Sequence, residues 1–336
     1  MPLRGLTGLG GGAAGKGGDG YTGGTIYTPG DGYQYNVFTA PGKLTIAGWP
    51  GNENCNIFMN GGGASGGTHH TGGHYACGGG GAGGRIDTGI PIANGSFDIT
   101  VGEGGVTSPS NSGVQQGSDG GITIAANIVG GSSDYVAAGG GGGGVEPGQG
   151  NQGGGGGGGG LQGGTGGEGN KYPNSPNCPA PLRGEPAGGN PTAAPSNQGE
   201  SGGPTGPPGG PNPQRHGGGG GGGGEPGQQG SSGGNGGRGT QVSWMVPNVG
   251  TPGPSPGRYF SAGGGGAPQQ PGRAVGEGGQ GGGTDGNLNP TGSSGDATWG
   301  SGSGGCCANN DTSLPGDYKA GNGGDGIFVI RFNLSA

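Results

Sequence analysis

The chain has 336 residues, of which 111 are glycine and 28 are proline, and only 24% are apolar. So little apolar surface, without the strict repeat of collagen, is typical of disordered chains, because burial then offsets little of the backbone entropy lost on folding. The net charge is −7 and the 12 basic residues are scattered, which argues against nucleic acid as a partner. No run of eighteen apolar residues and no apolar N-terminal stretch occurs, so we expect neither membrane insertion nor secretion through a signal peptide.

Residues 1–31 are rich in glycine and are expected to form an N-terminal docking segment. Glycine recurs here in period three, broken once by Ala14, at Gly5, Gly8, Gly11, Gly17, Gly20 and Gly23. The sequence GGGAAGKGG at 10–18 imitates a phosphate-binding loop. That loop requires Ser or Thr after its lysine, where this chain has Gly17, and a strand before it. We therefore expect no nucleotide and no other cofactor.

Residues that favour β-strands gather near the two ends of the remaining chain, 32–336. Two segments contain turn signals, Pro-Gly at 41–42 and Asn-Gly at 94–95, and each is predicted to be a hairpin. The predicted β segments are 32–48, 55–60, 84–102, 120–130 and 326–334. The last segment, GIFVIRFNL, is expected to close a sheet made by the earlier ones and so to clamp the glycine-rich insert between them, about 139–325.

The insert contains two tracts of eight consecutive glycines, Gly153–Gly160 and Gly217–Gly224. Polyproline-II geometry has three residues per turn, with backbone groups that point sideways and are unpaired within the helix. A helix with neighbours on all three faces must therefore consist of glycine alone. A helix at the surface needs glycine only on its inward face, and 224–239 has glycine in period three. The predicted fold is all-β and irregular: a small antiparallel β framework clamps a stack of polyglycine-II helices, with almost no α-helix.

The pattern of a large residue followed by small residues and then glycines recurs in HYACGGGG (74–81), DYVAAGGGG (134–142) and RYFSAGGGG (258–266). Each copy predicts a strand or aromatic anchor that leads into a polyglycine helix. From residue 33 to the end, the order of these motifs resembles the glycine-rich domain of bacteriophage tail-fibre and adhesin proteins. A similar domain occurs outside the cell in anaplastic lymphoma kinase-type receptors. The phage resemblance implies receptor-binding loops between the glycine motifs, and it implies no catalytic residues.

A histidine- and cysteine-rich stretch is a weak candidate for a metal site. His69, His70, His74 and Cys77 lie within nine residues, and imidazole and thiolate are good zinc ligands. No carboxylate lies close in sequence to orient them, so a surface loop without metal is the favoured interpretation. The five cysteines are too few and odd in number for a disulfide scaffold. Cys306 and Cys307 could form a vicinal disulfide, but a reduced pair is favoured, and Cys55 and Cys77 are expected to be buried thiols.

Loops rich in side chains separate the glycine tracts and carry exposed aromatic residues. Aromatic side chains on a rigid scaffold commonly bind sugars or protein surfaces. The candidate receptor-binding residues are Tyr172, Trp244, Met245, Tyr259, Trp299 and Tyr318. Each could instead hold its loop onto the lattice. No serine, cysteine or carboxylate is arranged with a histidine as in known catalytic sites, so we expect no enzyme.

The sequence therefore favours a bacteriophage virion protein, at a tail-fibre tip or related appendage, that binds the host surface without chemistry. The expected partners are a host surface glycan or outer-membrane protein and other virion or fibre proteins, and self-association is left open. The alternative is a purely structural subunit of a fibre, capsid decoration or filament. A third hypothesis is an ice-binding protein, because one antifreeze class stacks polyglycine-II helices, but the bulky, proline-rich loops argue against it.

Overall fold

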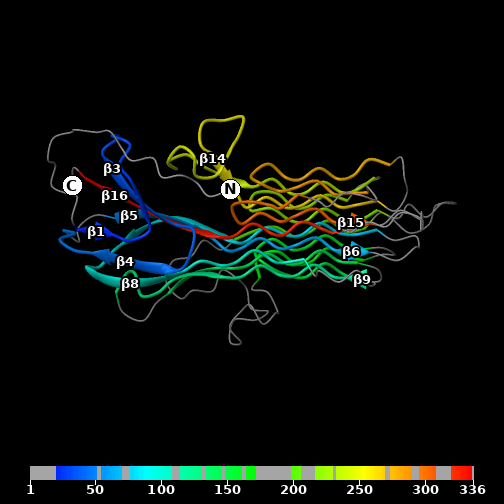
Figure 1. The fold of residues 1–336 in the computed structure, drawn as a ribbon, viewed down its shortest axis with the longest axis horizontal. Coiled ribbons are helices and arrows are strands. Elements are labelled where there is room, and N and C mark those ends of the chain that lie inside the picture. The colour runs from blue at the N-terminus through cyan, green and yellow to red at the C-terminus, as the bar shows by residue number, and fades with distance from the viewer. Residues whose placement is uncertain are drawn as a thin grey trace.

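A computed structural model describes residues 20–50, 54–69, 76–107, 114–130, 134–145, 148–160, 164–171, 198–205, 216–229, 232–268, 273–288, 295–307 and 319–334. These residues form an all-β fold without a helix, which confirms the predicted fold class. The molecule is elongated, with a β framework at one end and long glycine-rich segments that extend from it to the other (Figure 1).

Two five-stranded sheets form most of the framework. The first sheet has the order β1 (Tyr21–Thr22), β4 (Gly42–Ile46), β8 (Gly95–Thr100), β10 (Thr123–Ala125) and β11 (Tyr135–Ala137). The second sheet has the order β2 (Thr25–Tyr27), β3 (Tyr33–Phe38), β16 (Ile327–Asn333), β5 (Asn54–Asn60) and β7 (Arg85–Pro91). Residues 21–27, which lie in the expected N-terminal segment, thus provide an edge strand to each sheet. The main apolar core lies between the two sheets.

Two three-stranded sheets complete the fold. The cover sheet consists of β12 (Thr240–Val242), β14 (Arg258–Phe260) and β13 (Thr251–Pro252). Residues of this part of the chain pack on the outer face of the second sheet, so the framework has three layers. The far-end sheet consists of β15 (Cys306–Cys307), β6 (Thr68–His69) and β9 (Val114–Gln115), and it lies at the opposite end of the molecule from the framework (Figure 1).

The two predicted hairpins are wrong, because the strands of each pair lie in different sheets. β3 and β4 flank the Pro-Gly turn, and β7 and β8 flank Asn94 and Gly95, yet neither pair is hydrogen-bonded. Each turn crosses from one sheet to the other, so that both of its strands bury side chains in the shared core. Asn94 also holds the chain that follows β4: its Oδ1 accepts a hydrogen bond from the Trp49 amide at 2.8 Å, and its Nδ2 donates to the Trp49 carbonyl at 2.9 Å.

The closing segment forms β16, the central strand of the second sheet. It pairs with β3 on one side and β5 on the other, as the sequence predicts. Alternate side chains point to opposite faces of a strand, and β16 is buried on both. Phe328, Ile330 and Phe332 contact the core between the large sheets, whereas Ile327 and Val329 contact the cover sheet.

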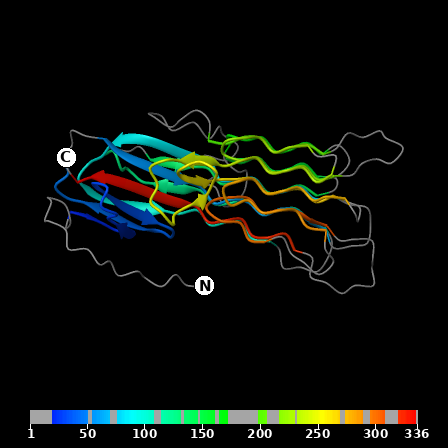
Figure 2. The ribbon, with the colours of Figure 1, turned by 90° about the horizontal axis from the view of Figure 1, so that it is seen from above.

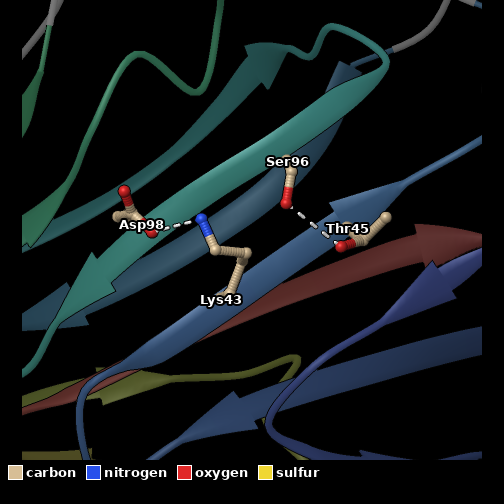
Figure 3. A network of polar contacts seen from close by, with 4 residues as sticks. All are labelled: Lys43, Thr45, Ser96 and Asp98. Atoms are coloured by element: carbon tan, nitrogen blue, oxygen red, sulfur yellow. Dashed lines mark hydrogen bonds and ion pairs between the residues drawn. The ribbon is translucent and has the colours of Figure 1, made fainter.

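Over β4 and β8, the outer face of the first sheet is polar and is exposed to solvent. Lys43 on β4 lies opposite Asp98 on β8, and their Nζ and Oδ1 atoms are 2.7 Å apart. Thr45 and Ser96 form the next pair, with their hydroxyl oxygens 3.2 Å apart (Figure 3). Exposed pairs of this kind contribute little to stability, roughly 0–1 kcal/mol. This face is therefore a suitable place for control substitutions.

Most strands continue directly into glycine-rich segments, here called rods. The rods that continue strands are 61–67 after β5, 76–84 before β7, 101–107 after β8, 116–122 before β10, 138–145 after β11, 232–239 before β12, 261–267 after β14 and 319–326 before β16. The predicted passage from aromatic anchor to polyglycine is thus confirmed at β11 and β14. The rods lie side by side although they come from distant parts of the chain, and they also occur outside the expected insert (Figures 1 and 2).

The hydrogen bonds of rod 61–67 show the geometry of the lattice. The amides of Gly61, Ala64 and Gly67 donate to rod 76–84, whereas those of Gly62 and Ser65 donate to rod 116–122. The direction of donation therefore repeats every third residue, which is the period of a polyglycine-II helix. Neighbouring rods satisfy the backbone groups that such a helix cannot satisfy internally.

The tract that begins at Gly217 is surrounded by rods on all sides. Its amides donate in turn to 261–267, 156–159 and 225–228, and its carbonyls accept from three further segments, 79–82, 200–203 and 234–237. A Cβ built on any glycine from Gly217 to Gly222 would lie 1.9–2.3 Å from a backbone atom of a neighbour. Steric exclusion of the β-carbon therefore explains the glycine at every position from Gly217 to Gly222.

Segment 224–239 differs from the single surface helix that its glycine period predicts. Its C-terminal rod, 232–239, directs two faces inward: Gly233 and Gly236 donate to the chain at 274 and 277, and Gly234 donates to Gly217. Only the third face, which carries the exposed Arg238, points outward. A rod at the surface of the lattice thus still has neighbouring rods on two of its three faces. It therefore requires glycine at two positions in every three.

Candidate binding site

A row of polar and aromatic side chains crosses the outer face of the second sheet. The strand register places Arg331 on β16 directly opposite Tyr35 on β3 and Asn56 on β5. Residues opposite one another in neighbouring strands project from the same face. The row begins where the apolar contact with the cover sheet ends, at the part of β16 that is farther from the rods.

The guanidinium of Arg331 is held between two aromatic rings. Its central carbon lies 4.5 Å from the centroid of the Tyr33 ring and 4.8 Å from that of Trp244. Its Nε also donates a hydrogen bond of 3.1 Å to Asn56 Oδ1. Cation–π contacts and a fixed hydrogen bond hold an arginine in one orientation, so this guanidinium is preorganised.

Trp244 follows β12 and covers the row. Its indole Nε1 donates to Asp87 Oδ1 at 3.1 Å, and its ring stacks on that of Tyr35 with centroids 6.5 Å apart. Burial raises the pKa of Asp87, and the hydrogen bond from the indole acts in the opposite direction. Trp244 is half-buried, which leaves part of the indole available for a ligand.

Tyr35 is buried and donates its hydroxyl hydrogen to Asp31 Oδ2 at 2.6 Å. Burial, and next the hydrogen bond to Asp31, raise the pKa of Tyr35 to about 12. The other carboxylate oxygen of Asp31 accepts the Tyr33 amide at 3.1 Å. These two hydrogen bonds fix the Asp31 carboxylate, and because Asp31 is exposed, the carboxylate remains accessible to solvent.

A hollow of about 510 Å³ lies over these groups, here called the aromatic–arginine pocket. Its lining includes Asp31, Tyr35, Trp244, Met245 and Arg331. Small-molecule sites commonly have about 300–1,000 Å³ and combine apolar walls with a few fixed polar groups. An indole, a guanidinium donor and a carboxylate acceptor, all held in place, suit a sugar ring with its apolar face and its hydroxyls.

The raised pKa of Tyr35 predicts a change in stability at high pH. An unfolded tyrosine loses its proton near pH ~10, whereas folded Tyr35 keeps it to about 12. The contribution of this proton to stability is therefore complete below about pH 10 and is lost as the pH rises through about 12. Urea unfolding between about pH 9 and 12 should show wild type losing more stability than Tyr35→Phe. Parallel losses in the two proteins would contradict the shifted pKa.

Of the other predicted site residues, Met245 lines the pocket, whereas Tyr259 and Trp299 are not among its lining residues. Met245 and Tyr259 are 7% and 6% exposed. Trp299 packs its ring against Phe260 at a centroid distance of 6.2 Å, and its backbone carbonyl accepts a hydrogen bond of 2.7 Å from the side-chain Nδ2 of Asn60. Met245 and Trp299 pack in the apolar cluster on the outer face of the second sheet and so attach their loops to the framework, whereas Tyr259 lies on β14. Tyr172 and Tyr318 lie outside the described residues.

Arg331, Tyr33, Tyr35 and Asp31 were missed from the sequence. One signal was available: Arg331 interrupts an apolar strand, IFVIRF, and a charge in a buried strand requires a partner. Its partners are 87 to 300 residues away in the chain, and only the fold brings them together.

The metal-site candidates are only partly described. His69 and Cys77 are both buried, whereas His70 and His74 lie outside the described residues. Within the described ranges, no three His, Cys, Asp or Glu side chains converge as a metal site requires. The surface position favoured for this stretch is wrong at His69, which is buried, whereas the buried thiol predicted at Cys77 is confirmed.

A second, polar hollow of about 800 Å³ lies on the side of the lattice. Its side chains are largely engaged with one another. Asp119 Oδ1 accepts hydrogen bonds from the Gly142 amide and from Asn151 Nδ2, both at 2.8 Å, and Gln116 Nε2 donates to Asn151 Oδ1 at 2.6 Å. The described residues that line it include no aromatic side chain, so the aromatic–arginine pocket is the stronger candidate site.

The described part of the chain contains no helix that is long and apolar enough to cross a membrane. No protein-family model matches the chain, and comparison with curated proteins also found no match.

Proposed function

We propose that the protein is a bacteriophage virion protein, at a tail-fibre tip or related appendage, that binds a glycan of the host surface non-covalently. The observation that supports a binding function is the aromatic–arginine pocket, in which Trp244, Arg331 and Asp31 are held in place around one hollow. The order of glycine motifs along the chain, which resembles phage adhesins, supports the location.

The rigid scaffold also supports this proposal. Backbone groups of the rods are bonded to one another, so the lattice itself offers few groups to a partner. Recognition then falls to side chains at the framework and in the loops. A preorganised site binds with a smaller loss of conformational entropy than a mobile one, which suits an appendage that must capture a surface.

Filling the pocket should reduce binding without unfolding the protein. Ser243 lines the hollow and is exposed, so Ser243→Tyr places a ring in the space without disturbing the core. The matched control is Thr45→Tyr, on the exposed face of the first sheet. Binding is measured on a panel of immobilised bacterial lipopolysaccharides and capsular polysaccharides. We expect wild type and the control to bind alike, and Ser243→Tyr to bind about thirtyfold more weakly.

Three outcomes distinguish the alternatives. Equal binding by wild type and Ser243→Tyr would exclude the pocket as the glycan site. Binding to cells that survives glycan oxidation by periodate but not protease treatment would identify an outer-membrane protein as the receptor instead. A protein that binds neither glycans nor cells, and that antibodies locate along a shaft or on a shell of the particle, would support the purely structural alternative.

A further inference from the structure

Cys77 and the consecutive cysteines Cys306 and Cys307, from two distant parts of the chain, lie near one another at the far end of the lattice. The rod 76–84 runs antiparallel to the chain at 300–303: the Gly83 amide donates to the Gly300 carbonyl at 2.7 Å, and the Gly80 amide donates to Ser303 at 2.8 Å. One further step of three residues along each rod reaches Cys77 on one and β15 on the other.

The direction of the side chains selects one pair. Successive side chains of an extended strand point to opposite sides, and β15 separates its two thiols accordingly. Cys307 packs with Cys77 in one apolar cluster, together with Val145 and Ala267, whereas Cys306 packs with Ala320 in another. This arrangement favours a link between Cys77 and Cys307 over the vicinal one.

The rods hold the selected pair within reach of a covalent bond. Cys307 lies one residue beyond the position that the register brings opposite Cys77, and the two side chains pack in the same apolar cluster. The thiols of Cys77 and Cys307 are in hydrogen-bonding contact, and both are reduced and fully buried. Little movement is needed to join them.

We propose that Cys77 and Cys307 are a latent disulfide, which forms when the protein meets a small-molecule disulfide oxidant and staples the far end of the lattice. One thiolate attacks the oxidant, forming a mixed disulfide and releasing one thiol. The second protein thiolate displaces the other half. The two protein sulfurs lose two electrons, the oxidant gains them, and the two protons leave with the two released thiols.

The closed lattice controls when the reaction occurs. Burial raises the pKa of the Cys307 thiol, and a protonated thiol is a poor nucleophile. Exchange therefore takes place while the far end is open, either during folding or in local opening events. The neutral disulfide then suits the apolar surroundings as well as the thiols do.

The staple would act where the fold is weakest. The framework holds one end of the rods through two five-stranded sheets, whereas the far-end sheet consists of strands of only two residues each. A bond from 77 to 307 closes a loop of about 230 residues, and long loops give disulfides their largest effect on the unfolded chain.

The test is disulfide mapping by mass spectrometry after refolding with oxidised glutathione. We expect a Cys77–Cys307 link in wild type and in Cys306→Ala, the matched control, and none in Cys77→Ala. The oxidised wild type should melt about 5 °C or more above the reduced protein. If a variant does not fold, disulfide mapping of the wild type alone still tests the proposal.

A wild type that keeps both thiols free after this treatment would overturn the proposal. A link that joins Cys306 to either neighbour would overturn the choice of pair, and equal melting temperatures of oxidised and reduced protein would contradict a staple. None of these results depends on whether the protein binds glycans.

Discussion

Gly220→Ala is expected to prevent the formation of soluble, folded protein. A Cβ at this position would lie 2.0 Å from the carbonyl oxygen of Gly80, in a neighbouring rod. Backbone atoms on the other sides of Gly220 block any escape, because this rod has neighbours on every face. Overpacking that the structure cannot relax costs about 4 kcal/mol or more, and Gly220→Val should be worse. Soluble yield and thermal unfolding measure the effect.

Gly223 supplies the matched control on the same face of the same rod. Its built Cβ lies 3.1 Å from Thr240 Oγ1 and 3.3 Å from the side chain of Arg85. Both neighbours are side chains that can move by a few tenths of an ångström. We therefore expect Gly223→Ala to fold and to melt close to wild type. If both variants fold equally well, the rods are not packed as described.

Removal of residues 326–336 is expected to abolish folding, although it deletes only a small part of the chain. β16 is the central strand of the second sheet, and its side chains from Ile327 to Ile330 are fully buried. Without it, β3 and β5 lose their common partner and both apolar clusters of the framework lose contacts. Circular dichroism and thermal melting measure the loss.

A chain that ends at residue 334 keeps all of β16 and serves as the control. Phe328→Ala offers a milder version, with an expected loss of roughly 3–5 kcal/mol. A cooperative transition at the wild-type temperature in the chain lacking 326–336 would show that β16 does not hold the framework together.

The rods could be predicted from the sequence because their cause is local and steric. A tract of eight glycines has few ordered solutions, and period three follows from the geometry of the helix. The strands β5 and β16 were also predictable from their apolar β-branched and aromatic residues. The two crossings at Pro41 and Asn94 were not, because a turn signal specifies a reversal but does not specify which strand the chain then pairs with.

In the candidate site, too, features with a local cause could be predicted from the sequence and nonlocal contacts could not. Trp244 was found because an aromatic residue in a polar loop is conspicuous, whereas Arg331, Tyr35 and Asp31 are unremarkable until the register of the second sheet aligns them. Cys77 and Cys307 likewise become neighbours only through the antiparallel contact between two rods. Contacts that depend on nonlocal pairing are beyond what spacing along one sequence can specify.

Native-state amide hydrogen exchange at Gly217–Gly222 tests most directly whether the glycine tracts are ordered by one another. Each of these amides donates a hydrogen bond to a neighbouring rod, and a buried, bonded amide exchanges only when the surrounding structure opens. We expect protection as strong as that of β16, because both lie in the interior of the fold. Exchange at the rate of an unstructured chain, with β16 still protected, would contradict the lattice.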